Sequence, residues 1–218
     1  MNDDQVDVVL PCLDEAGALP QVLAALPGRY RAIVVDNGST DDSAEVAAAL
    51  GAKVVHEPRR GYGAAVHTGL EAATADIVCF ADADGSLDLA ELPMLVDGLI
   101  EADLAVGRRV PSGQGVWPWH ARAGTVLVSS LLRRQGLPVR DIAPLRAVRR
   151  QALLDLGVTD RAFGYPLELL IKARRAGWLV AEFDVSYGER AKGTKSKVSG
   201  SLRGTLRAAR DFGRVLSR

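Results

Sequence analysis

Two acidic residues, one position apart, are the residues of this sequence best placed to do chemistry. Asp82 and Asp84 follow the largely apolar run Asp76–Phe80. Because side chains alternate between the two faces of a strand, both carboxylates point the same way and repel each other unless a cation lies between them. Oxygen ligands without a nearby Cys or His suit Mg²⁺ or Mn²⁺, which commonly bind together with a diphosphate. A solvated acidic turn is the alternative, since a lone Asp-x-Asp pair is a weak signal.

The acid pair stands at the end of one of four predicted strands. The strand-like runs are Val6–Leu10, Ala32–Val35, Lys53–His56 and Ile77–Ala81. Strands that alternate with helices at this spacing predict a mostly parallel sheet built from βαβ units, and ligands bind at the carboxyl ends of such strands. Asp36 follows the second strand, as Asp82 and Asp84 follow the fourth. The sequence therefore predicts an α/β fold with a site at this edge of the sheet.

The second half of the chain has a looser pattern. We expect a loop at 107–119, helices at 120–134 and 165–176, a short helix after Asp141–Arg146, a strand at 179–185 and a basic loop at 192–197. Trp117 and Trp119 stand in the first loop. They form either a lid or acceptor platform, or the closed edge of the core.

Charge divides the chain into two unlike halves. Residues 1–107 contain 5 Lys and Arg against 19 Asp and Glu, whereas residues 108–218 contain 22 against 8. An acidic half can hold a metal and a basic half can receive anions, although the two halves could simply attract each other. At 218 residues and 48% hydrophobic content, we expect one continuous domain rather than two.

The sequence gives no sign of a membrane span or a secretion signal. Its cysteines, Cys12 and Cys79, lie in or beside apolar runs and are expected to be buried thiols in a reducing, cytoplasmic compartment. Arginines recur at helical spacing near the end of the chain, at Arg203, Arg207, Arg210 and Arg214. Such a helix either makes peripheral contact with the anionic inner surface of a membrane or packs its leucines on its own domain.

Four motifs in order resemble one enzyme family. They are Pro11–Glu15, Asp36–Asp41, Asp82–Asp84 and the basic segment Arg190–Ser201. In this order, the chain resembles the inverting glycosyltransferases of family two, with the GT-A fold, and especially their polyprenyl-phosphate or dolichyl-phosphate sugar synthase branch. The resemblance covers nearly the whole chain. It implies a single-domain GT-A fold whose half 1–107 binds a nucleotide sugar and whose half 108–218 faces the acceptor.

The resemblance also implies roles for individual residues. The donor-binding residues would be Pro11, Leu13, Glu15, Asp36, Gly61, Asp82 and Ala83. Among them, Asp36 would accept hydrogen bonds from the base, and Asp82 and Asp84 would hold Mg²⁺ or Mn²⁺ against the diphosphate. Independently, Gly61 and Gly63 at a helix start would let the donor approach the backbone closely. Ser86 replaces the Gln that often adds a metal contact in the lipid-phosphate branch.

The acceptor side is less clearly marked. The position of the family's usual catalytic base falls on Pro166. A sugar hydroxyl needs a general base, whereas a phosphate oxygen is already ionised and needs none. If a base is required, the candidates are Glu168 and Asp141; for Glu168 a surface acid or an ion pair is equally compatible. The phosphate- or acceptor-binding candidates are Arg146, Arg190, Lys195 and Lys197.

We therefore expect a metal-dependent glycosyltransferase that moves a hexose from a nucleotide-diphosphate sugar to an acceptor such as a polyprenyl phosphate. A sugar nucleotidyltransferase and a non-catalytic nucleotide-sugar-binding protein are the alternatives. The family resemblance adds a homodimer to the expectations, and no nucleic-acid partner is expected. The sequence leaves the base and sugar of the donor open.

Overall fold

The structure is a computed structural model that describes residues 5–113, 116–117, 119–134, 136–142, 144–191 and 210–215. Its strands are β1 (Val6–Cys12), β2 (Tyr30–Asp36), β3 (Lys53–His56), β4 (Ile77–Phe80), β5 (Leu104–Pro111), β6 (Arg146–Arg149) and β7 (Val180–Tyr187). Its helices are α1 (Leu19–Ala24), α2 (Ser43–Ala49), α3 (Tyr62–Ala72), the 3₁₀ turn η1 (Leu89–Glu91), α4 (Leu92–Gly98), α5 (Trp119–Arg134), α6 (Arg150–Asp155) and α7 (Tyr165–Arg175).

The strands form one seven-stranded sheet in the order β3-β2-β1-β4-β6-β5-β7. Strand β6 pairs antiparallel with both β4 and β5, and the other pairings are parallel. The register sets Cys12 opposite Asp36, and Val9 opposite Phe80. The polar segments that follow β1, β2 and β4 therefore meet at one edge of the sheet, which we call the carboxyl edge. The predicted α/β fold with a mostly parallel sheet is confirmed.

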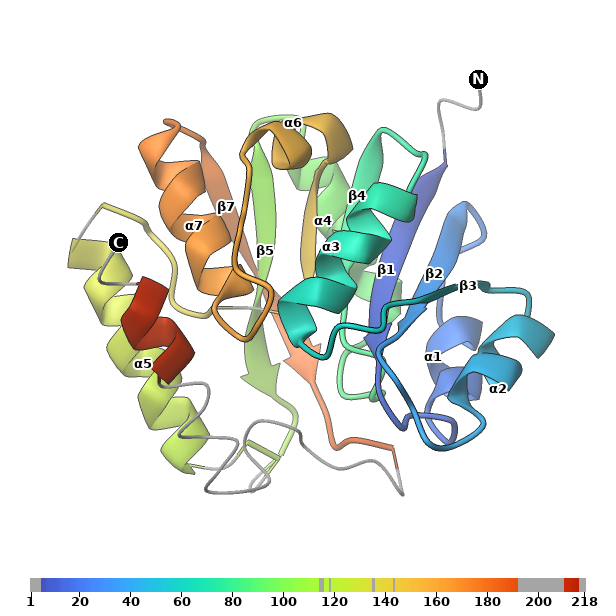
Figure 1. Cartoon of the computed structure of the whole chain (residues 1–218). Helices are drawn as coiled ribbons and strands as arrows, with labels where there is room; N and C mark the ends of the chain where they lie inside the picture. The colour runs from blue at the N-terminus through green and yellow to red at the C-terminus, as the bar shows by residue number, and fades with distance from the viewer. Residues whose placement is uncertain are drawn as a thin grey trace.

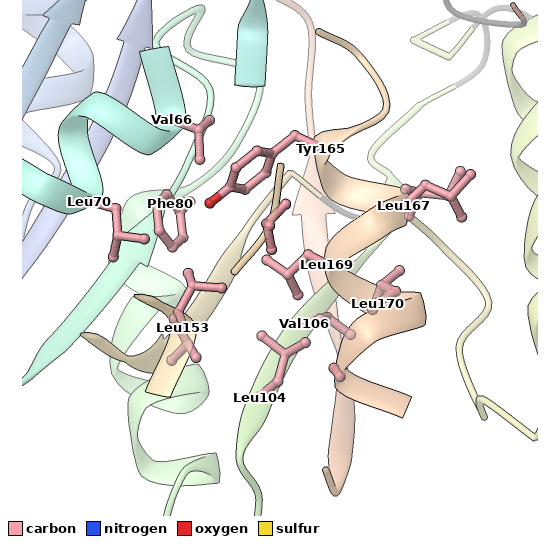
Figure 2. Close-up of a cluster of buried hydrophobic side chains, with 14 of the residues drawn as sticks. Val66, Leu70, Phe80, Leu104, Val106, Leu153, Tyr165, Leu167, Leu169 and Leu170 are labelled. Atoms are coloured by element: carbon pink, nitrogen blue, oxygen red, sulfur yellow. The ribbon is translucent and has the colours of Figure 1, made fainter. Parts of the chain in front are cut away.

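Helices cover both faces of this sheet (Figure 1). One apolar cluster joins α3, α6 and α7 to the sheet, and Figure 2 shows Leu104, Val106 and Phe80 of the strands beneath Tyr165 and Leu169 of α7. A second cluster joins α1, α2 and α4 to the opposite face. The inner strands β1, β2 and β4 are buried along most of their length, which explains their nearly continuous apolar sequences.

The structure differs from the expected second half in two strands. Strand β5 continues to Pro111, where we expected a loop from residue 107, because β7 pairs with it along its whole length. Gly107 permits this pairing, since a Cβ there would lie 2.9 Å from Val185. The expected short helix after residues 141–146 is preceded by strand β6, whose four residues are too few to show a period of two.

The described part of the final segment packs on its own domain. Residues 210–215 are helical, and Val215 is buried in the cluster that contains α7. Arg203 and Arg207 lie outside the described residues, so the rest of that expected helix is not seen. Within the described ranges, no helix is both long and apolar enough to cross a membrane.

Candidate active site

The acid pair follows β4 at the carboxyl edge. Asp84 is buried, and its Oδ1 accepts hydrogen bonds from the Ser86 backbone N–H (3.0 Å) and hydroxyl (2.6 Å). Burial, and then repulsion by Asp84, raise the pKa of Asp82 to about 6. Ala83, between them, is buried in the apolar cluster on the other face, so it can offer a ligand only its backbone. Strand β4 itself ends at Phe80, so the pair lies in the turn that follows the strand.

The two carboxylates fit a divalent cation that arrives with its own ligands. Among the described residues, no group of three or more His, Cys, Asp or Glu could hold a metal by itself. Mg²⁺ and Mn²⁺ commonly bind one or two carboxylates and complete their coordination with substrate phosphate and water. A cation here would also relieve the repulsion that raises the pKa of Asp82. Asp82 and Asp84 are therefore the residues that would hold the metal. The backbone N–H and hydroxyl of Ser86 donate hydrogen bonds to Asp84.

Arg190 follows strand β7 by three residues and contacts this pair. Its guanidinium Nε donates to Asp84 Oδ2, and the two side chains form an ion pair. The backbone fixes this arrangement, because Gly188 N–H donates to Ser86 O (2.8 Å) and Ala191 N–H donates to Asp84 O (2.9 Å). Of the predicted phosphate-binding residues, Arg190 thus lies at the acid pair, whereas Lys195 and Lys197 lie outside the described residues.

Arg109 is a site residue that sequence reasoning missed. Its Nε and Nη2 donate to Oδ2 and Oδ1 of Asp141, both at 2.8 Å, and its backbone N–H donates to Oδ2 at 3.0 Å. The guanidinium carbon lies 4.2 Å from the ring centre of Trp117 and 5.4 Å from that of Tyr187. The charge of Arg109 also lowers the pKa of Asp82. The sequence predicts a loop at this residue, whereas the structure places it near the carboxyl end of strand β5. A predicted strand here would have indicated Arg109 as a site residue, because ligands bind at the carboxyl ends of such strands.

The same contacts describe the candidate base Asp141. Its side chain is 1% exposed, and both carboxylate oxygens bind the guanidinium of Arg109. A general base needs a lone pair directed at the acceptor hydroxyl. In this arrangement Asp141 holds Arg109 in place, and Trp117 packs over that arginine; the role of Asp141 as a base stays a prediction.

Arg146 lies opposite Phe80 in the pairing of β6 with β4, at the strand end that leads to the acid pair. It is 2% exposed, donates through Nη2 to Ile142 O, and its Nε has no hydrogen-bond partner among the described residues. Burial lowers its pKa, while Tyr62 and the carboxylates of Asp141 and Asp82 act in the opposite direction. A buried cation beside Asp82 is consistent with the predicted anion-binding role, although Arg146 is too enclosed in this structure to touch a ligand without movement.

Glu168, the other candidate base, is also bound by donors of the chain itself. Its Oε1 accepts hydrogen bonds from Thr159 N–H (3.1 Å) and Oγ1 (2.9 Å), and its Oε2 accepts one from Asp160 N–H (2.6 Å). Burial would raise its pKa, but these hydrogen bonds and Lys172 lower it. The carboxylate thus holds the loop before α7 and forms the ion pair with Lys172 that the sequence allowed, at 3.5 Å. The structure brings neither candidate base to the acid pair as a free carboxylate.

Asp36 ends β2 with its carboxylate at the carboxyl edge. Oδ1 accepts a hydrogen bond from Ser39 N–H (3.0 Å), and Oδ2 lies 3.2 Å from His56 Nδ1. Although burial would raise its pKa, hydrogen bonds from Ser39 and His56 lower it, so Asp36 is an ionised acceptor. This state suits hydrogen bonds from the N–H groups of a base.

The predicted segment Pro11–Glu15 lies beside Asp36 across the pairing of β1 with β2. Asp14 adopts a left-handed backbone conformation (φ 54°), which Asp and Asn tolerate best among residues with a Cβ. Its Oδ1 accepts hydrogen bonds from the Thr40 N–H (2.7 Å) and hydroxyl (3.1 Å). The loop is thereby tied to the Asp36–Asp41 turn, which leaves Pro11 and Leu13 half-buried and Glu15 buried next to it.

Gly61 and Gly63 pack closely against the chain's own backbone. A Cβ at Gly61 (φ 148°) would collide with the Arg161 carbonyl oxygen, and one at Gly63 would lie 2.8 Å from the Arg161 carbonyl carbon. The Gly63 N–H donates to Ala162 O and the Ala64 N–H to Arg161 O. The chain's own 161–162 backbone therefore occupies the start of α3, where we had expected the donor.

The fold and this site define an α/β protein with an acid pair and three buried or half-buried arginines at the carboxyl edge, suited to a phosphate-bearing ligand and a divalent cation. Comparison with known proteins gives the family: the chain belongs to glycosyl transferase family 2, whose model matches residues 7–157. The resemblance drawn from the motifs is confirmed, as is the expectation that the protein is a glycosyltransferase.

Three similar proteins illustrate the relationship. A glycosyltransferase of Mycobacterium tuberculosis is 62% identical over 219 residues, 100% of each chain. A dolichyl-phosphate hexose transferase of Haloferax volcanii is 33% identical over 88% of this chain and 86% of its own. The crystal structure of glucosyl-3-phosphoglycerate synthase from Mycobacterium tuberculosis, in complex with Mn²⁺, uridine diphosphate and glucosyl-3-phosphoglycerate, has a TM-score of 0.75 and 27% identity, covering 98% of this chain and 78% of that one.

Proposed function

We propose that this glycosyltransferase moves a hexose, with inversion, from a nucleotide-diphosphate sugar to the phosphate of a polyprenyl phosphate, assisted by Mg²⁺ or Mn²⁺. The observation that carries the proposal is the composition of the site. Arg109, Arg146 and Arg190 surround the acid pair, whereas Asp141 and Glu168 are bound by the chain's own donors. Such a site favours an acceptor that brings its own negative charge and needs no base.

The donor side of the proposal follows the carboxyl edge. Asp36 would accept hydrogen bonds from the base, with Pro11, Leu13 and Glu15 beside it. The Mn²⁺ and uridine diphosphate of the related synthase structure support a nucleotide diphosphate and a divalent cation in this position. A cation held by Asp82 and Asp84 would neutralise charge that develops on the departing diphosphate.

Transfer of the hexose to a phosphate acceptor requires no general base from the protein. An ionised phosphate oxygen attacks the anomeric carbon, the bond from that carbon to the diphosphate oxygen breaks, and the nucleoside diphosphate leaves with the electron pair. No proton is transferred in this step. Arg109, held in place by Asp141, would orient the acceptor phosphate, and Arg190 would pass from Asp84 to a phosphate oxygen. The dolichyl-phosphate hexose transferase among the relatives supports this acceptor class.

The test is release of nucleoside diphosphate from a panel of UDP- and GDP-sugars, with Mg²⁺ or Mn²⁺, and with either a short polyprenyl phosphate, phosphoglyceric acid or no acceptor. We expect release that the polyprenyl phosphate stimulates and that Asp84→Ala abolishes. Stimulation by phosphoglyceric acid alone would contradict the acceptor. Release of pyrophosphate, or donor binding with no release under any condition, would favour the nucleotidyltransferase or the non-catalytic alternative.

A lipid-phosphate acceptor would place the reaction at the cytoplasmic surface of the inner membrane. Detection of the protein in the membrane fraction after gentle lysis, and its loss from that fraction at high salt, would support this location. Sedimentation velocity of the same preparation tests the homodimer expected from the family.

A further inference from the structure

The outward side of helix α5 carries solvent-exposed apolar side chains. Val126 and Leu127 are 53% and 64% exposed, whereas Val128 and Leu132 on the opposite side of the helix are buried. Val128, Leu132 and Val215 belong to one apolar cluster of the domain. Helix α5 is thus packed firmly through one side while an apolar pair remains open on the other.

Arginines flank this apolar pair. At 100° per residue, seven of the exposed or half-buried positions share one side of the helix, away from the buried Val128 and Leu132. We call them the outer face of α5: Arg122, Ala123, Val126, Leu127, Ser130, Arg133 and Arg134. Residues 119–134 contain no Asp or Glu. Apolar side chains beside arginines, without acids, are typical of a helix that lies on an anionic membrane surface, where arginine stems cover apolar area and their heads reach lipid phosphates.

The outer face lies next to the candidate active site. Helix α5 begins near the carboxyl edge, where β5 ends (Figure 1). Trp117, two residues before the helix, packs over Arg109 at 4.2 Å. Val126 is only seven residues into the helix, which corresponds to about 10 Å along its axis. A surface bound by α5 would therefore present its head groups at the level of Arg109.

The other strongly exposed apolar pair of the described residues has different surroundings. Ile100 and Leu179 are 84% and 65% exposed, and they line a groove together with Asp97, Glu101 and Arg174. Both residues precede strands, at the amino ends of β5 and β7, so they lie at the sheet edge opposite the active site. Two acids and one arginine give this groove no excess of positive charge to attract an anionic surface, which makes the pair a control of similar exposure.

We propose that the outer face of α5 docks on an anionic lipid bilayer and holds the carboxyl edge of the sheet against the head groups. Val126 and Leu127 enter the head-group boundary, and Arg122, Arg133 and Arg134 bind lipid phosphates. This contact differs from the one considered for the C-terminal arginines, because the described turn 210–215 packs through Val215 on its own domain.

The experiment measures binding of the full chain to vesicles of phosphatidylcholine, with and without phosphatidylglycerol, by co-sedimentation. The assay contains no sugar donor and no polyprenyl phosphate, so its outcome is separate from that of the transfer assay. We expect binding that requires phosphatidylglycerol and weakens with salt. The pair Val126→Gln and Leu127→Gln should lower the partition coefficient about tenfold. Arg133→Gln and Arg134→Gln should each lower it about fivefold.

Controls distinguish vesicle binding by the outer face of α5 from non-specific hydrophobic binding and from self-association of the protein. The pair Ile100→Gln and Leu179→Gln should leave vesicle binding unchanged, and thermal melts should show that every variant is folded. Equal loss of binding in this control pair, or no binding of the wild type to anionic vesicles, would overturn the proposal. So would a change in sedimentation velocity from dimer to monomer in the Val126 and Leu127 variant with vesicle binding retained, because α5 would then be an interface between copies.

Discussion

The guanidinium of Arg109 and the carboxylate of Asp141, 32 residues apart in sequence, form a bidentate and largely buried ion pair. Both nitrogen–oxygen distances are 2.8 Å. The pair holds the positive charge of Arg109 at the carboxyl edge, where it lowers the pKa of Asp82. On the same strand, Arg108 forms its own pair with Asp184, whose side chain is 58% exposed. The two neighbouring pairs therefore allow a direct comparison of buried and exposed charges.

Loss of the buried carboxylate should destabilise the protein strongly. Asp141→Asn leaves the cation of Arg109 buried without a countercharge, which should lower the free energy of unfolding by about 3 kcal/mol. Asp184→Asn, at the exposed pair, should cost less than about 1 kcal/mol. Urea unfolding followed by circular dichroism measures both changes, and equal losses in the two variants would contradict the buried role of Asp141.

The same residues distinguish a positioning role from a base. If Asp141 acts only through Arg109, Arg109→Gln and the double variant with Asp141→Asn should reduce kcat/KM by similar factors, because the two losses are not additive. A further tenfold or larger loss on adding Asp141→Asn to Arg109→Gln would show that the carboxylate acts by itself. Steady-state transfer rates, combined with the unfolding data, provide this readout.

Arg190 should compete with a divalent cation for Asp84. Because its guanidinium forms an ion pair with Asp84, Arg190→Gln should strengthen Mn²⁺ binding in the absence of donor by about tenfold. The same variant should weaken binding of the nucleotide diphosphate in the presence of Mn²⁺, since a phosphate ligand is lost. Electron paramagnetic resonance of Mn²⁺ measures the first effect and calorimetry the second.

The control for this experiment is Arg108→Gln, which removes an equal charge from an exposed pair and should change neither affinity. Weaker Mn²⁺ binding by the Arg190 variant would show that the guanidinium assists the metal rather than opposing it.

Asp82 should give both stability and binding a dependence on pH. Burial and the neighbouring Asp84 raise its pKa from 3.8 to about 6, so its ionisation opposes folding of the metal-free protein. This cost is absent below pH 4, grows between pH 4 and 6, and is complete above pH 6. In EDTA at pH 7.5, Asp82→Asn should therefore stabilise the protein by about 2 kcal/mol, and the gain should vanish at pH 4.

Metal-dependent donor binding should respond in the opposite sense. It requires ionised Asp82, so it should weaken as the pH falls through 6 and be lost in Asp82→Asn. The exposed Asp42 is the matched control, because Asp42→Asn should affect neither property. A stability gain for Asp82→Asn that is independent of pH would contradict the assigned ionisation.

The glycines at the start of α3 should prove structural. Gly63→Ala forces a Cβ against the backbone at Arg161 and the Cβ of Tyr165, at 2.8 Å each, and should cost about 2 kcal/mol of stability. Gly124→Ala, inside α5 with nothing within 4 Å, should instead stabilise by about 1 kcal/mol. Thermal melts test the pair, and a Gly63 variant with unchanged stability but impaired donor binding would restore the role first expected.

Residues that act through local pattern could be predicted from the sequence. The alternation of strands and helices up to residue 101, the turn after β2 and the acid pair after β4 all follow from periods of two and 3.6 and from turn chemistry. The family followed from four short motifs in order. Each of these signals lies within a few residues, so no distant contact is needed to interpret it.

Tertiary structure decided which candidate site residues already contact other parts of the chain. Asp141, Glu168 and Gly61 have residue types suited to catalysis or ligand approach, but each is matched by a partner far along the chain or in an adjoining loop. Arg109 became a site residue because β7 extends the sheet past Gly107, and Arg190 because a backbone pairing brings it back to Asp84. The sequence determined which groups the chain contains, and long-range packing decided which of them remain available, because a buried charge must find its partner wherever the fold places it.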